Sequence, residues 1–121
     1  MTKRILIVED HEDARRILRD MLATTDYELV EAENGEQALA EVARQRPDLI
    51  LMDIQLPILD GYEATRRIKA DPALRSIPII AVTSYALSGD EAKARAAGCD
   101  DFIPKPYSPR QLLAKVRQYL D

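Results

Sequence analysis

Short apolar runs alternate along the chain with segments in which apolar residues recur every three or four positions. The runs are rich in Ile, Leu and Val and stop at polar or turn-forming residues, which predicts β-strands at residues 4–9, 27–32, 49–53, 79–82 and 102–103. The spacing between the runs is typical of helices with one apolar face. The pattern therefore predicts five strands and five helices in strict alternation.

The helices carry recognisable start and stop signals. Asn34 is predicted to cap the start of the second helix. Ser88 with Glu91 is predicted to start the fourth helix, which Gly98 ends. Ser108 with Pro109 and Gln111 is predicted to start the fifth. In the first helix the apolar stripe consists of Ala14, Ile17, Leu18, Met21 and Leu22. Arg15 and Arg16, and Arg66 and Arg67 in the third helix, are expected on solvated faces.

The run at 49–53 is apolar without interruption until Asp53, and Pro57 and a turn signal at Asp60-Gly61 follow it. Such a run indicates a strand buried on both faces, as in the middle of a parallel sheet. Asp53 then lies at the carboxyl end of this strand, where open α/β sheets place their ligands.

Strict alternation with short connections predicts one α/β domain over residues 1–121. The expected architecture is a doubly wound, five-stranded parallel sheet of order 2-1-3-4-5 with right-handed crossovers and helices on both faces. No linker or repeat is visible, and the chain stops where the fifth helix stops. We therefore expect no separate output domain, and Met1 favours a native amino end.

Polar residues follow four of the predicted strands: Glu9 with Asp10, then Asp53, Thr83 and Lys105. Parallel strands share a direction, so these residues are expected along one edge of the sheet. Three carboxylates repel one another unless a cation lies between them, and Mg²⁺ suits this donor set better than Ca²⁺, which needs more oxygen ligands. Lys105 and Thr83 would add a positive charge and a hydroxyl donor for phosphoryl oxygens.

Four segments together resemble the receiver domain of bacterial two-component response regulators: residues 8–10, residues 51–57 with Gly61, residues 82–84 and residues 105–106. The resemblance covers essentially the whole chain and implies a flavodoxin-like fold. A finer similarity to stand-alone receivers of the cell-division type lies in residues 52–57, 89–91 and 98–99. Receivers fused to hybrid histidine kinases share these segments, so a domain excised from a larger regulator or hybrid kinase stays an alternative.

The resemblance implies that Asp53 accepts a phosphoryl group from a histidine kinase or a histidine phosphotransfer protein. It implies Mg²⁺ as cofactor, with Asp10, Asp53 and the backbone carbonyl of Gln55 as ligands and Glu9 acting through water. The chain departs from the family at His11, where Asn or Asp is frequent. An exposed loop residue is the plainer interpretation of His11, and its role is left open.

The resemblance also assigns the phosphoryl contacts and the switch. Thr83 and Lys105 would contact the phosphoryl oxygens, and Thr83 and Phe102 would relay phosphorylation to the surface of the fourth helix, fifth strand and fifth helix, where a downstream protein binds. A plain core role for Phe102 remains open. The family further suggests a cis Lys105-Pro106 bond.

The formal charge of −4 and pI near 5.1 disfavour nucleic acid and anionic membrane as partners. The partners expected are proteins, and the chain itself is expected as a monomer or a weak phosphorylation-linked dimer. A single cysteine, Cys99, and the lack of an apolar leader or span point to the cytoplasm, with Cys99 as a small buried hydrophobe.

Two rival functions use the same residues. An aspartate-nucleophile phosphohydrolase would need a second acid after Asp53 to protonate the leaving group, and Gln55 stands there instead. An interaction module that is never phosphorylated would have no use for the intact acceptor and Lys105. We therefore expect a signalling domain rather than an enzyme.

Overall fold

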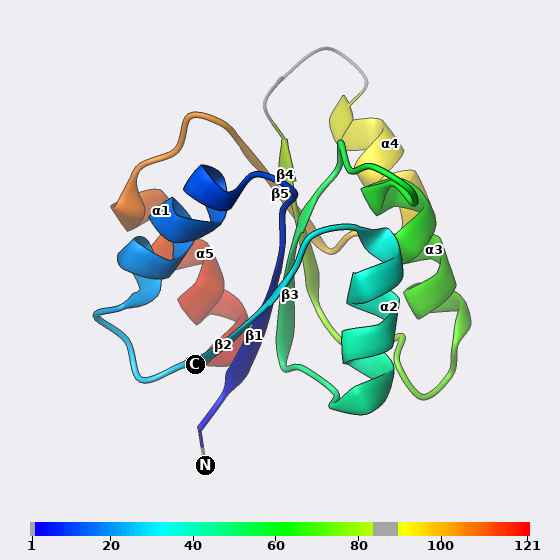
Figure 1. The fold of residues 1–121 in the computed structure, drawn as a ribbon, viewed down its shortest axis with the longest axis horizontal. Coiled ribbons are helices and arrows are strands. Elements are labelled where there is room, and N and C mark those ends of the chain that lie inside the picture. Colours follow the sequence, from blue (N-terminus) through cyan, green and yellow to red (C-terminus); the bar gives the residue numbers. More distant parts are fainter. Residues whose placement is uncertain (1, 84–89) are drawn as a thin grey trace.

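Five parallel strands form one sheet in the order β2-β1-β3-β4-β5 in the computed structural model, which describes residues 2–83 and 90–121 (Figure 1). The strands are β1 (Arg4–Val8), β2 (Glu28–Ala32), β3 (Leu49–Asp53), β4 (Ile79–Thr83) and β5 (Asp101–Pro104). The helices are α1 (Glu12–Leu22), α2 (Gly35–Arg44), α3 (Gly61–Ala70), α4 (Asp90–Ala97) and α5 (Pro109–Leu120). The predicted topology and strand order are confirmed.

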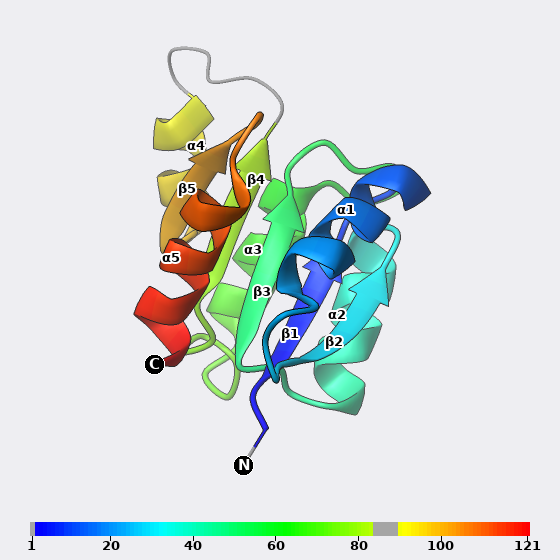
Figure 2. The same ribbon diagram turned by 90° about the vertical axis from the view of Figure 1, so that its left-hand side faces the viewer.

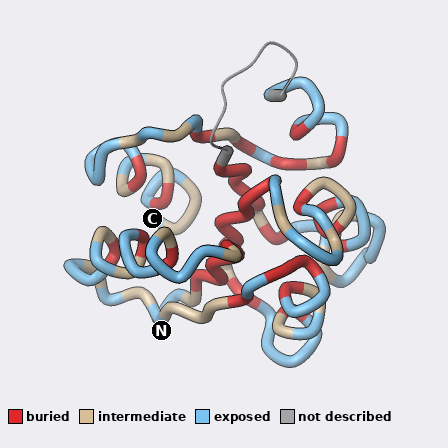
Figure 3. Tube along the Cα trace, turned by 45° about the horizontal axis from the view of Figure 1, so that its top comes forward, coloured by how far each residue is buried: buried red, intermediate tan, exposed pale blue. Residues whose placement is uncertain are grey.

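Each strand of the centre sends alternate side chains into two separate cores. Leu6 and Val8 of β1 pack toward α2, α3 and α4, whereas Ile5 and Ile7 pack toward α1 and α5. Figure 2 views the second of these faces, with α1 and α5 in front of the strands. All five residues of β3 are buried, and Figure 3 shows the buried chain running through the middle of the molecule. Burial on both faces is the reason that the central runs are continuously apolar.

The predicted caps are present wherever the structure describes them. At the start of α2, the side chain of Asn34 accepts a hydrogen bond from Gln37 N. At the start of α5, Ser108 and Gln111 form a capping box, and Pro109 is the first residue of the helix. Gly98 ends α4 with φ of +109°, a conformation that favours glycine. The predicted features at Ser84, Ser88 and Gly89 lie outside the described residues.

The expected faces of α1 are wrong at two positions. Arg15, expected in solvent, is only 8% exposed, and Ile17, expected in the apolar stripe, is 51% exposed. Leu18 and Leu22 provide the buried contacts of this helix. The spacing of apolar residues predicts which face of a helix is buried. It cannot show that buried hydrogen-bond acceptors are available to an arginine on that helix.

Candidate functional site

The carboxyl ends of four strands meet at one edge of the sheet. The register at this edge is Val8 with Met52, Asp53 with Val82, and Thr83 with Pro104. Glu9 and Lys105 directly follow β1 and β5, so they come to the same edge as Asp53. The predicted convergence is therefore present in the backbone before any side chain is considered.

Asp53 is the last residue of β3 and is only 7% exposed. The backbone N–H of Gln55 donates to its Oδ1 at 3.1 Å, which orients the carboxyl group. The start of α3 passes close by, since a Cβ at Gly61 would lie 2.3 Å from the Asp53 carbonyl oxygen. Glycine at 61 thus allows the loop after β3 to fold back tightly against the strand end.

Glu9 is buried to 1% exposure and binds the only lysine at this edge among the described residues. Lys105 Nζ donates to Glu9 Oε1 at 2.8 Å. The Lys105-Pro106 peptide bond is cis, as the family resemblance suggested. The lysine therefore reaches the acids from the loop after β5.

The pKa values of Glu9 and Asp53 move in opposite directions. Burial, reinforced by the neighbouring Glu9 charge, raises the pKa of Asp53 to about 7. Burial opposes the charge on Glu9 as well, but hydrogen bonds with Asp53 and Lys105 outweigh it and lower the pKa of Glu9 to about 2. Asp53 is therefore the more readily protonated of the two carboxyl groups.

Asp10 completes the acidic group. Burial and the neighbouring Glu9 raise the pKa of Asp10. Its Oδ1 is buried and receives no hydrogen bond, although His11 Nδ1 lies 3.2 Å away and would form an ion pair if protonated. A buried carboxylate oxygen without a donor, beside the carboxylate of Glu9, fits a hard divalent cation such as Mg²⁺. Among the described residues, Glu9, Asp10 and His11 each bring one possible ligand atom within 4.8 Å of the other two.

The remaining predicted residues are placed in part. Thr83 ends β4 beside Pro104 of β5, and its side chain lies outside what the structure describes. Phe102 pairs with Ala81 in the register of β4 and β5 and packs, partly buried, against the core under α3 and α4. Cys99 is buried, as predicted, and burial raises the pKa of its thiol.

Two residues near the site were not singled out from the sequence. Tyr107 lines the same hollow as Lys105. Burial, followed by the charges of Glu9 and Asp53, raises the pKa of Tyr107 to about 12. Arg15 donates to the backbone carbonyl of Glu9. A Tyr two residues after Lys105 and an Arg six residues after Glu9 could have been found only by asking which long side chains can reach the strand ends.

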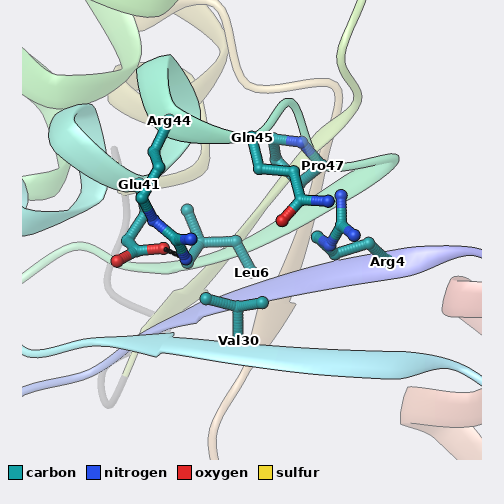
Figure 4. A pocket seen from close by; sticks show the side chains of 7 residues that line it. All are labelled: Arg4, Leu6, Val30, Glu41, Arg44, Gln45 and Pro47. Atoms are coloured by element: carbon teal, nitrogen blue, oxygen red, sulfur yellow. Dashed lines mark hydrogen bonds and ion pairs between the residues drawn. The ribbon is translucent and has the colours of Figure 1, made fainter.

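Two hollows differ in their relation to the acids. The first lies between α1 and the loop after β5 and is lined by Ala14, Ile17, Met21, Lys105, Pro106 and Tyr107. The second lies at the opposite edge of the sheet, where Arg44 pairs with Glu41 at 2.6 Å and the Arg4 side chain points toward Gln45 (Figure 4). Only the first adjoins the site, because Lys105 lines it.

The model of the response regulator receiver domain matches residues 5–117, nearly the whole chain. The chain belongs to this family. Its strand order, its acidic strand ends and its lysine beside a cis proline are thus those of a receiver with the features of a phosphoacceptor signalling switch.

Relatives of this receiver come from stand-alone regulators and from histidine kinases. The polar-differentiation response regulator DivK of Brucella anthropi is 44% identical over 120 residues, which cover 99% of this chain and 98% of the relative. The receiver domain of a sensor histidine kinase from Pseudomonas aeruginosa is 38% identical with a TM-score of 0.91, covering 99% and 98% of the two chains. That structure has a magnesium ion coordinated in its active-site cleft.

A receiver of a signal transduction histidine kinase from Syntrophus aciditrophicus is 36% identical with a TM-score of 0.92 and covers 98% of this chain and 90% of its own. The similarity to stand-alone DivK regulators spans nearly the full length of both proteins.

No helix in the described ranges has the length and apolar composition needed to cross a membrane.

Proposed function

We propose that Asp53 is the phosphoacceptor of this receiver and that residues 1–121 work as one switch unit. The observation that carries the proposal is the convergence of Glu9, Asp53 and Lys105, three residues far apart in sequence, at a single buried edge of the sheet. A buried carboxyl group beside a fixed ammonium group has the composition of a phosphoryl-transfer site.

Mg²⁺ is the proposed cofactor, held by Asp10, Asp53 and the Gln55 carbonyl, with Glu9 acting through water. When bound, the cation neutralises charge on the phosphoryl oxygens and on the carboxylates. The buried Oδ1 of Asp10, which accepts no hydrogen bond, supports this assignment. Burial and the charge of Glu9 raise the pKa of Asp53 despite the nearby Lys105, so a further cation would stabilise the ionised form.

In the proposed reaction a carboxylate oxygen of Asp53 attacks the phosphorus of a phosphohistidine in line. The new O–P bond gives an acyl phosphate, the P–N bond breaks, and the imidazole of the donor leaves with that electron pair and takes up a proton. Lys105 then leaves Glu9 for a phosphoryl oxygen. Thr83 donates its hydroxyl to another oxygen, a role that stays a prediction.

The output surface is proposed to lie on α4, β5 and α5. Phe102 belongs to β5 and pairs with Ala81, which lies two residues before Thr83 in β4. A movement at the end of β4 would therefore be passed to the paired strand β5. Receivers relay such changes by shifting the population of two conformations. A downstream protein that reads this surface is the proposed partner, and a weak dimer formed on phosphorylation would use the same elements.

A histidine kinase or histidine phosphotransfer protein is the proposed donor. The donor has to bring its histidine to Asp53, and the hollow between α1 and the loop after β5 adjoins the site through Lys105. Ile17 lines this hollow together with Ala14 and Met21 and is 51% exposed. We infer that an apolar segment of the donor covers Ile17 during transfer.

The experiment that tests the proposal is mass spectrometry of the intact protein after incubation with acetyl phosphate and Mg²⁺. The wild type should gain one phosphoryl group, and Asp53→Asn should gain none. Full labelling of that variant would reject Asp53 as the acceptor. Continuous turnover of phosphomonoesters by the wild type would instead support the phosphohydrolase alternative.

A further inference from the structure

Arg15 is a charged side chain inside the molecule, close to the acids but not part of them. It lies on α1, and its side chain is 10% exposed. Its Nη1 donates to the backbone carbonyl of Glu9 at 2.8 Å in a buried hydrogen bond. An arginine is costly to bury unless its donors are paired, so this placement requires a structural reason.

The Glu9 peptide is held from two sides. Its N–H donates to the carbonyl of Ala32 at the end of β2 at 3.0 Å, and its carbonyl accepts from Arg15. The side chains of Glu9 and Asp10 branch from the two Cα atoms on either side of the Glu9 carbonyl, at the carboxyl edge of the sheet. Fixing the carbonyl of Glu9 fixes the orientation of the peptide that joins the two acids.

The positive charge of Arg15 is balanced elsewhere. Its Nε donates to Glu31 Oε1 at 3.1 Å and its Nη2 to Glu33 Oε1 at 3.3 Å, both on or after β2. Glu31 also binds Arg19 of α1 at 2.7 Å. The guanidinium thus reaches three acceptors through three different nitrogens of a planar fork, a geometry that the single nitrogen of a lysine does not have.

We propose that Arg15 is a positioning residue of the cation site. It acts through the main chain of Glu9 and Asp10 and makes no contact with the phosphoryl group. The inference rests on the proposed function, because it assumes that these acids bind Mg²⁺. Groups that orient metal ligands without binding the metal commonly change affinity by about 10- to 100-fold when they are removed.

Arg19 offers a matched control on the same helix. It binds the same Glu31, and among the described residues it forms no hydrogen bond with the Glu9 carbonyl. Arg15→Met and Arg19→Met each remove one of the two ion pairs between α1 and Glu31, but only the first frees the Glu9 carbonyl. A structural effect of the link alone would therefore appear in both variants.

The test is a titration of each purified protein with Mg²⁺ alone, followed by the NMR amide signals of residues 9–11 and 53–55, well below the melting temperature of each. Arg15→Met should bind Mg²⁺ about tenfold more weakly than the wild type, whereas Arg19→Met should stay within about twofold. Equal affinity of Arg15→Met and wild type, or equal weakening in both variants, would overturn the inference.

A second variant covers the case in which Arg15→Met does not fold. Arg15→Lys keeps the charge and loses the fork, so it should bind Mg²⁺ more weakly than the wild type by a factor of about three or more. An affinity equal to that of the wild type would overturn the inference. Failure of the proposed function is distinguishable, because it would appear as a wild type that takes up no phosphoryl group at Asp53.

Discussion

Lys105 Nζ lies 2.8 Å from Glu9 Oε1, and burial together with the charge of Glu9 raises the pKa of the neighbouring Asp53. The lysine is therefore bound to an acid beside the proposed acceptor rather than to the acceptor itself. Phosphorylation of Asp53 would offer Lys105 a more strongly charged partner. This arrangement leads to separate predictions for stability and for reactivity.

Replacing Lys105 with Met should destabilise the protein by roughly 3 kcal/mol at neutral pH, because it leaves the buried Glu9 without its cation. The pKa of Glu9 is lowered in the folded protein. Its ionised side chain therefore stabilises the fold at pH values above its ordinary pKa of 4.5, and this contribution is lost as the pH falls toward 2. The difference between the two proteins should therefore shrink in acid. Urea denaturation at pH 7 and pH 3.5 measures both quantities.

The double variant Glu9→Gln with Lys105→Met provides the control for this prediction. It removes the charge that Lys105→Met strands, so it should recover much of the lost free energy of unfolding. A double variant no more stable than Lys105→Met would show that the ion pair is not the cause.

Replacing Asp53 with Asn should stabilise the metal-free protein at pH 8 by roughly 2 kcal/mol. The pKa of Asp53 is raised to about 7 in the folded protein. Below pH 3.8, its ordinary pKa, the carboxyl is neutral in both the folded and the unfolded chain, and its burial costs little free energy. Stability is then lost as the pH rises through about 7. Thermal melts of the two proteins in a chelator should thus diverge between pH 4 and pH 8. Parallel curves over this range would contradict the assignment of the shift to Asp53.

The reaction with acetyl phosphate should depend on pH and Mg²⁺ together. Only the ionised carboxyl of Asp53 is a nucleophile, and its raised pKa keeps it partly protonated near pH 7 without the cation. At low Mg²⁺ the initial rate should rise with pH through about 7, and saturating Mg²⁺ should move this midpoint lower. A midpoint that does not change with Mg²⁺ would argue against a cation beside Asp53.

Ile17→Ser should impair phosphoryl transfer from a protein donor by tenfold or more while leaving the reaction with acetyl phosphate unchanged. Ile17 is 51% exposed beside the hollow that Lys105 lines, so its loss should affect recognition more than folding. Arg67→Ser, at an exposed position of α3, is the matched control. Equal loss with both phosphoryl donors would point to a disturbed site instead.

The architecture was predictable because parallel sheets buried on both faces need continuous apolar runs, and β1, β3 and β4 have them. The convergence of Glu9, Asp10, Asp53 and Lys105 followed from strand direction alone. These inferences depend only on which residues are apolar and on where the runs end.

Partner choice at short range could not be predicted in the same way. Nothing in the order of the residues indicates that Lys105 binds Glu9 rather than Asp53, because this depends on how far each side chain extends from its strand end. Burial of Arg15 was missed because its acceptors, the Glu9 carbonyl and two glutamates, come from different segments. The exposure of Ile17 was missed because it lies in an apolar stripe that is wider than the surface the helix buries.

Mapping the modified residue tests the central claim most directly. After reaction with acetyl phosphate and Mg²⁺, borohydride reduction of the acyl phosphate and proteolysis, mass spectrometry should find Asp53 converted and every other aspartate and glutamate unchanged. Conversion of Glu9 or Asp10 with Asp53 intact, or no conversion at all, would contradict the account.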